Sequence, residues 1–262
     1  MSGEPLHVAN EHFVNEALRL VAKADEQGIR LRILGSIAYR LHSPENIHLF
    51  AEMERALTDV DFAGDRSQSR NIRRFMKEEG YESDEGILVG SEGARHIYVH
   101  PETRLNVDVF IDELYFCHPI PLKDRLHLDY PTITTTDLLL EKMQIVEINL
   151  KDIKDALVLL LEHPVGEPSA GKENIDLEYI TNIMSVDWGF FYTFTTNLRR
   201  LIDDLPQFPA IDPAGAEQIS RRIDRLLEAI DRAPKSWKWK MRARLGTRKR
   251  WYQEVAEKDA IY

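Results

Sequence analysis

The chain has 262 residues, of which 43% are apolar, and this is enough to bury a sizeable core in one large domain or two small ones. No apolar stretch approaches the ~20 residues that a membrane-spanning helix needs, and residues 1–10 lack a secretory pattern. The single cysteine, Cys117, excludes an internal disulfide framework, and the net charge of −10 argues against a general nucleic-acid coat, so we expect a cytoplasmic protein without membrane contact.

The first half of the chain alternates between helical and strand patterns. Residues 10–27 repeat apolar side chains at helical spacing, and a short apolar strand, 31–34, runs into Gly35-Ser36, where Ser36 is expected to cap a helix over 37–41. Further patterns predict a helix over 67–79 and strands over 57–62, 87–89, 96–99 and 105–111. Residues 1–130 are therefore predicted to form an α+β domain, in which helices flank a mixed β-sheet.

The second half, residues 131–262, is predicted to be a helical C-terminal domain. Helices are expected over 137–146 and 149–161, the second with Asn149 as its cap, and another begins at Asp212-Pro213. The change from mixed to helical patterns places the domain boundary near residue 130.

Three aspartates lie where carboxylates are costly. Asp59 and Asp61 belong to the predicted strand 57–62, and Asp108 belongs to the strand 105–111. Residues two apart in a strand share a face, so Asp59 and Asp61 repel each other by a few kcal/mol at an effective dielectric of ~20. This indicates a bound cation, and Gly35-Ser36 at a helix start would let phosphates approach backbone N–H groups. The pattern therefore predicts a metal–nucleotide site.

The motifs resemble a known signature. Residues 34–36 (Leu-Gly-Ser), 59–62 (Asp-Val-Asp-Phe) and 107–110 (Val-Asp-Val-Phe) are similar, in this order, to the motifs of the DNA polymerase beta-type nucleotidyltransferase superfamily. Residues 36–42, the helix lysine Lys142 and the Lys-Asp-x-x-Asp-like element at 151–155 further resemble the group that includes the abortive-infection nucleotidyltransferase toxins.

This resemblance implies a nucleotidyltransferase-type fold and an enzyme that moves a nucleoside monophosphate from an NTP to a hydroxyl, with release of pyrophosphate. It implies that Asp59, Asp61 and Asp108 hold two Mg²⁺ ions and act in catalysis. The nucleotide-binding residues that it implies are Gly35, Ser36, Lys142 and Lys151.

Several alternatives remain open from the sequence. The stretch between Ser36 and Asp59 is longer than in the superfamily, which indicates an insertion over residues 43–56, and Asp112 competes with Asp108 as the third acid. The acceptor can be an RNA end, a small molecule or a protein hydroxyl. A non-catalytic binding protein with this fold, such as a toxin–antitoxin partner, and a metal-dependent nuclease are the rival functions.

Outside these motifs, two further observations bear on partners. The nine histidines show no metal-ligand spacing, and His96 and His100 are interpreted as surface residues. Residues 232–250 contain nine Lys or Arg and no acid, so the remainder carries −10 − 9 = −19. With Trp237, Trp239 and Trp251, this basic stretch, Arg232–Trp251, is either an RNA contact or a terminal helix that packs its tryptophans on the body.

Overall fold

The structure is a computed structural model that describes residues 6–167 and 171–254. Its helices are α1 (Leu6–Glu26), α2 (Gly35–His42), α3 (Ile47–Glu52), α4 (Ser69–Glu78), α5 (Glu85–Gly90), α6 (Thr135–Met143), α7 (Leu150–Glu162), α8 (Leu177–Val186), α9 (Trp188–Asp204), α10 (Pro213–Arg232) and α11 (Trp237–Leu245). Its strands are β1 (Leu31–Leu34), β2 (Val60–Gly64), β3 (Glu82–Ser83), β4 (Arg95–Val99), β5 (Asn106–Ile111), β6 (Glu113–Tyr115), β7 (Pro119–Pro121), β8 (Val165–Gly166) and β9 (Ile175–Asp176).

A five-stranded mixed sheet organises the first half, with strand order β1-β2-β5-β4-β3. β2 runs parallel to β5, whereas the β1–β2, β4–β5 and β3–β4 pairs are antiparallel. The β4–β5 pair is the hairpin that the sequence predicts around residues 100–103. The parallel β2–β5 pair places two strands that are distant in sequence side by side at the centre of the sheet.

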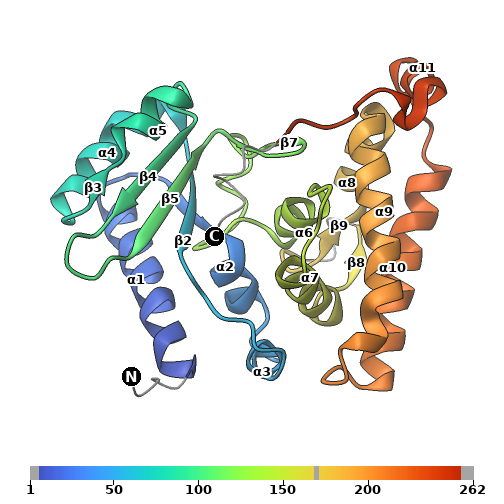
Figure 1. The fold of residues 1–262 in the computed structure, drawn as a ribbon, viewed down its shortest axis with the longest axis horizontal. Helices are drawn as coiled ribbons and strands as arrows, with labels where there is room; N and C mark the ends of the chain where they lie inside the picture. Colours follow the sequence, from blue (N-terminus) through green and yellow to red (C-terminus); the bar gives the residue numbers. More distant parts are fainter. Residues whose placement is uncertain (1–5, 168–170, 255–262) are drawn as a thin grey trace.

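Helix α2 lies between this sheet and the helical half of the protein. It contacts β1 and β2 on one side and α6 and α7 on the other (Figure 1). Beyond α6 and α7, helices α8, α9 and α10 pack together, and α11 contacts α8 and α9. One buried apolar cluster extends from Ala17 in α1 to Ile230 in α10, so the halves share a core.

The predicted α+β fold class, a mixed sheet flanked by helices and followed by a helical region, is confirmed. The chain just after residue 130 is tied to the sheet, because Ile33 N–H donates to the Pro131 carbonyl at 2.9 Å and Ile133 N–H donates to the Ile33 carbonyl at 3.0 Å. The two-domain division near residue 130 stays a prediction. None of the described helices is both long enough and apolar enough to cross a bilayer.

Two local predictions were wrong. Residues 87–89 belong to helix α5 and not to a strand, because the Asp84 carboxylate accepts a hydrogen bond from Ile87 N–H at 3.1 Å and starts the helix. Ser36 is not a cap, since α2 begins one residue earlier at Gly35. The proposed insertion, residues 43–56, contains α3, which buries Leu49 and Phe50.

Candidate active site

A pocket of about 550 Å³ lies where the sheet, α2, α6 and the start of α7 meet. Six of the seven residues that the sequence singles out line it, namely Ser36, Asp59, Asp61, Asp108, Lys142 and Lys151. The seventh, Gly35, begins α2 directly beside the pocket. The structure therefore brings together residues that are spread from position 35 to position 151.

The register of the sheet explains why the aspartates meet. Asp61 in β2 is the direct partner of Asp108 in β5, and paired residues on neighbouring strands point to the same face. Asp59 lies two residues before Asp61 and lines the same pocket, although β2 itself begins at Val60. Asp112, the competing candidate, is not among the residues lining the pocket; its carboxylate accepts a hydrogen bond from Arg66 N–H at 2.9 Å.

Gly35 is required by the close approach of Asp61. Its φ is +65°, and a Cβ added there would lie 2.3 Å from Asp61 Oδ2, a distance that no side chain tolerates. The Gly35 N–H donates a hydrogen bond of 3.1 Å to Glu141 Oε2 from α6. Gly35 thus holds the start of α2 against two carboxylates, and its own N–H is already used.

Acidic side chains gather at the floor of the pocket. Burial is the largest cause that raises the pKa of Asp61 well above its ordinary value, and Asp59, Asp108 and Glu141 raise it further. Burial likewise raises the pKa of Glu141. Lys142 lowers the pKa of both carboxyls but only partly offsets burial. A cation at this floor would favour the ionised forms, so the arrangement fits a metal site.

The Lys142 ammonium, which the resemblance assigns to nucleotide binding, is already shared among carboxylates. Its Nζ lies 3.2 Å from Glu141 Oε1, 3.2 Å from Asp152 Oδ1 and 3.8 Å from Asp155 Oδ2. Asp155 is also held by Arg55, whose Nε and Nη2 donate hydrogen bonds of 2.9 and 2.8 Å. Burial lowers the pKa of Lys142, but these carboxylates together raise it above its ordinary value. Lys142 therefore neutralises the wall of the pocket.

Lys151 differs from Lys142 in its surroundings. It is exposed at the start of α7, where its backbone N–H donates to the side chain of the predicted cap residue, Asn149 Oδ1, at 2.8 Å. Among the described residues, its ammonium has no hydrogen bond or ion pair. It is thus available to an anion that enters the pocket.

Arg95 is a pocket residue that the sequence reasoning missed. It lies in β4 opposite Phe110, two positions along from Asp108, and its guanidinium is 5.3 Å from the Phe110 ring. Its Nε donates to both Asp108 oxygens at 3.1 and 2.9 Å, and its Nη2 donates to Oδ2 at 2.5 Å. Arg95 thus orients the Asp108 carboxylate. The predicted strand began at residue 96, one position after Arg95, so the prediction did not include this side chain.

The C-terminal segment forms another wall that was not predicted. Tyr252, Gln253 and Glu254 line the pocket, and the Gln253 N–H donates to the Cys117 carbonyl at 3.0 Å. Trp251 anchors the segment, because its Nε1 donates to Thr193 Oγ1 at 3.0 Å. The chain runs back from the basic helix α11 to the pocket in order to reach this position.

The tryptophans of the basic stretch divide into two kinds. Trp237 is 73% exposed, whereas Trp239 packs edge-on against Phe191 and Trp251 against Tyr192. Packing therefore accounts for two of them. Lys238 and Lys240 are exposed on α11, so part of the positive charge faces solvent.

Asp59, Asp61 and Asp108 line the pocket and offer only oxygen ligands. This set of donor atoms suits Mg²⁺. Burial and the neighbouring acids raise the pKa of Asp61, and a cation placed there would lower it again. The chemistry of these side chains suits such ions, and the binding of two ions at this floor stays a prediction.

No family model matches this sequence, and no curated protein matches it. A solved structure, that of an antigenic nucleotidyltransferase-like protein from Paracoccidioides brasiliensis, is similar with a TM-score of 0.43 and 15% identity, over 87% of this chain and 96% of that chain. A similarity this weak carries no argument about function. The interpretation of the pocket therefore depends on its own geometry.

Proposed function

We propose that the chain is a metal-dependent nucleotidyltransferase that moves a nucleoside monophosphate from an NTP to a hydroxyl acceptor. The observation that carries this is that Asp61 and Asp108, on paired strands, and Asp59, just before β2, line one pocket at the start of α2. In the reaction, the acceptor oxygen bonds to the α-phosphorus, the bond from that phosphorus to the bridging oxygen breaks, and pyrophosphate leaves.

Each residue has a role in this proposal. Asp59 and Asp61 hold the ions, and Asp108, oriented by Arg95, completes the ligand set and receives the acceptor proton. Bound Mg²⁺ would supply charge neutralisation of the triphosphate and of the transition state. Because the Gly35 N–H is occupied by Glu141, contact with the phosphates falls to Ser36 at the start of α2 and to Lys151.

The acceptor remains open among an RNA end, a small molecule and a protein hydroxyl. The observation that favours RNA is the exposed part of the basic stretch, which contains Trp237, Lys238 and Lys240. Binding of tRNA across a salt series, in the wild type and with both lysines changed to Glu, tests this. A flat salt response would leave the small molecule and the protein hydroxyl.

The activity itself is tested with each of the four NTPs labelled at the α-phosphate, offered with tRNA, with the protein alone and with small alcohols. Label should transfer only with Mg²⁺, and Asp61→Asn should lower the rate on the order of 10²–10⁴-fold. Asp112→Asn is the matched control, since this acid directly follows the last residue of β5 and is not among the residues that line the pocket.

The rival functions give different results in the same assay. A non-catalytic binding protein would bind NTP without transferring label to any acceptor. A nuclease would degrade the tRNA in the absence of any NTP. Transfer that is equally fast in Asp61→Asn would show that the pocket is not the active site.

A further inference from the structure

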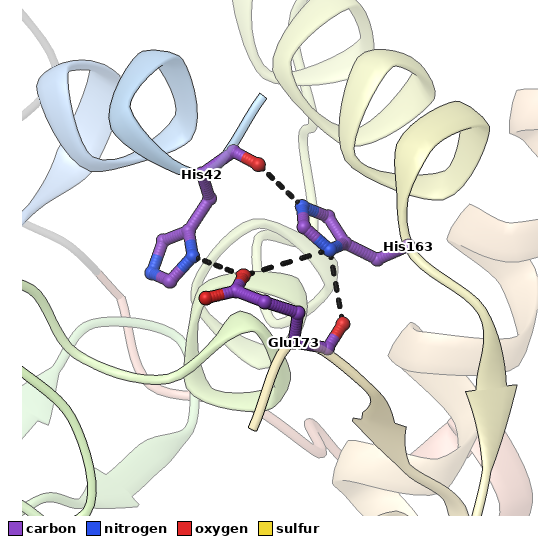
Figure 2. A group of neighbouring side chains, drawn as sticks. All are labelled: His42, His163 and Glu173. Atoms are coloured by element: carbon purple, nitrogen blue, oxygen red, sulfur yellow. Dashed lines mark hydrogen bonds and ion pairs between the residues drawn. The ribbon is translucent and has the colours of Figure 1, made fainter. Parts of the chain in front are cut away.

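A second group of side chains lies at the other ends of the same helices that form the pocket. His42 is the last residue of α2, His163 follows the last residue of α7, and Glu173 lies just before β9. Figure 2 shows both imidazole rings beside the Glu173 side chain, each from a different element. This group, the His–Glu cluster, is separate from the carboxylate pocket.

The three side chains are close enough to share one ion. One ligand atom from each lies within 4.8 Å of the other two. Glu173 Oε2 is 2.7 Å from His42 Nδ1 and 3.7 Å from His163 Nδ1. The Glu173 backbone carbonyl is also 2.9 Å from His163 Nδ1. Both Nδ1 atoms therefore face oxygen atoms of a single residue.

The far nitrogen of each ring is fixed by a backbone carbonyl. His42 Nε2 lies 3.0 Å from the Ile133 carbonyl oxygen, and His163 Nε2 lies 2.7 Å from the His42 carbonyl oxygen. A carbonyl oxygen only accepts, so each Nε2 can keep the proton of a neutral ring when a metal ion takes the place of the Nδ1 proton that now faces Glu173. Histidines that bind metals donate their other N–H in this way, which sets tautomer and ring orientation.

Two ring nitrogens and a carboxylate thus converge on one space, where either the Nδ1 protons or a metal ion can lie between them. A buried carboxylate completes the surroundings. Asp129 Oδ2 has no hydrogen-bond partner and lies 3.7 Å from His42 Nε2, while Lys172 Nζ lies 3.2 Å from the other oxygen. A carboxylate beside the N–H of a ligand histidine strengthens that ligand.

We propose that His42, His163 and Glu173 bind one divalent transition-metal ion of the zinc class through the two Nδ1 atoms and a Glu173 oxygen. Two imidazoles and a carboxylate suit Zn²⁺, whereas the all-oxygen floor of the pocket suits Mg²⁺. The ion joins the end of α2 to the end of α7 and to the segment before β9. It fixes the two helices whose other ends carry Ser36 and Lys151.

Zinc binding is tested on chelator-treated protein by titration in competition with a chromophoric chelator. One Zn²⁺ per chain is expected, in the wild type and in an Asp61→Asn background alike, because the background alters only the carboxylate pocket. Glu173→Gln should weaken binding by more than the ~10–100-fold that loss of an outer partner costs, and Asp129→Asn by about 10-fold.

Glu178→Gln is the matched control, since this exposed glutamate lies five residues after Glu173 and should leave affinity unchanged. Co²⁺ in place of Zn²⁺ should give the visible spectrum of a nitrogen- and oxygen-ligated ion, and His163→Gln should abolish it. The Glu173 side chain is 44% exposed, so Glu173→Gln remains informative if the buried His163 variant fails to fold.

The proposal is overturned if no stoichiometric Zn²⁺ binds, or if Glu173→Gln binds it as tightly as Glu178→Gln. Thermal stability that responds to pH but not to Zn²⁺ would show that protons, and not a metal, fill the cluster. Neither outcome bears on nucleotide transfer, which the labelling assay measures separately.

Discussion

The charged side chains at the two ends of helices α2 and α7 are arranged in opposite ways. Near their N-terminal ends lie Asp61 of β2 and Glu141 of α6, and burial is the main cause that raises the pKa values of both. At their C-terminal ends, the hydrogen bond from His42 is the largest cause that lowers the pKa of Glu173. Acidic side chains lie together near the N-terminal ends, whereas a carboxylate lies beside two imidazoles near the C-terminal ends.

The difference teaches where a ligand should be sought. Like charges kept together indicate that binding, and not folding, selected the arrangement at the pocket. Two imidazoles that converge on a carboxylate suit the structural metal ion that we propose there. The same pair of helices can therefore carry an ion for chemistry at one end and an ion for structure at the other.

The largest expected change comes from the buried pair that supports the acid-rich end. Asp155→Ala should destabilise the protein by about 3–5 kcal/mol, because Arg55 is left buried and Lys142 loses a partner. Urea unfolding monitored by circular dichroism measures it. Glu217→Ala, which removes an exposed pair with Arg221, should cost at most about 0.5 kcal/mol. Similar losses in both variants would mean that the pair at Asp155 is not effectively buried.

A smaller effect isolates the contact between α2 and Asp61. Gly35 and Gly28 both have positive φ, +65° and +69°, but only at Gly35 does an added Cβ meet Asp61. Gly28→Ala should cost about 1 kcal/mol from backbone strain alone, and Gly35→Ala about 1–3 kcal/mol more. Thermal unfolding of the two variants gives the difference directly. Equal losses would show that Asp61 moves away at no cost.

The smallest effect has opposite signs at the two ends. In chelated buffer, Asp61→Asn should leave stability unchanged or raise it by up to about 1 kcal/mol, since it removes a repelling charge. Because the folded state raises the pKa of Asp61, ionisation costs stability as pH rises above the ordinary carboxyl range, so the gain should grow with pH.

Glu173→Gln should instead lower stability slightly. The folded state lowers the pKa of Glu173, so its contribution is present above the ordinary carboxyl pKa and is lost as pH falls through the lowered value. Unfolding of both variants at several pH values compares the ends. A gain in stability in Glu173→Gln, or a clear loss of stability in Asp61→Asn, would contradict the difference that we expect between the two ends.

The sequence predicted what local patterns determine. Alternation predicted strands at 57–62 and 105–111, where the structure has β2 and β5 with Asp61 and Asp108, and the cap at Asn149 located the start of α7. Arg95 and Glu141 were missed, since their partners are set by strand register and helix packing. His96 was interpreted as a surface residue, yet it is 2% exposed, and burial lowers its pKa to about 4.

The His–Glu cluster shows the limit most clearly. Its histidines are separated by a large part of the chain, so no short-range spacing could reveal them, and the sequence indicated no metal site among the histidines. Only the packing of α2 against α7 brings His42 to His163. A group of side chains that is brought together by a helix–helix contact cannot be recognised from a periodic pattern in the sequence.

The wall at Tyr252–Glu254 has a consequence for how the pocket is made. The ribosome supplies the sheet, α2, α6 and α7 before residue 163, but this wall emerges about 90 residues later, after the whole helical half. During synthesis, the residues of the acidic floor are therefore made before the segment 252–254, in which the Gln253 N–H donates to the Cys117 carbonyl. A chain that ended before residue 252 would carry the three aspartates in a pocket that lacks this wall.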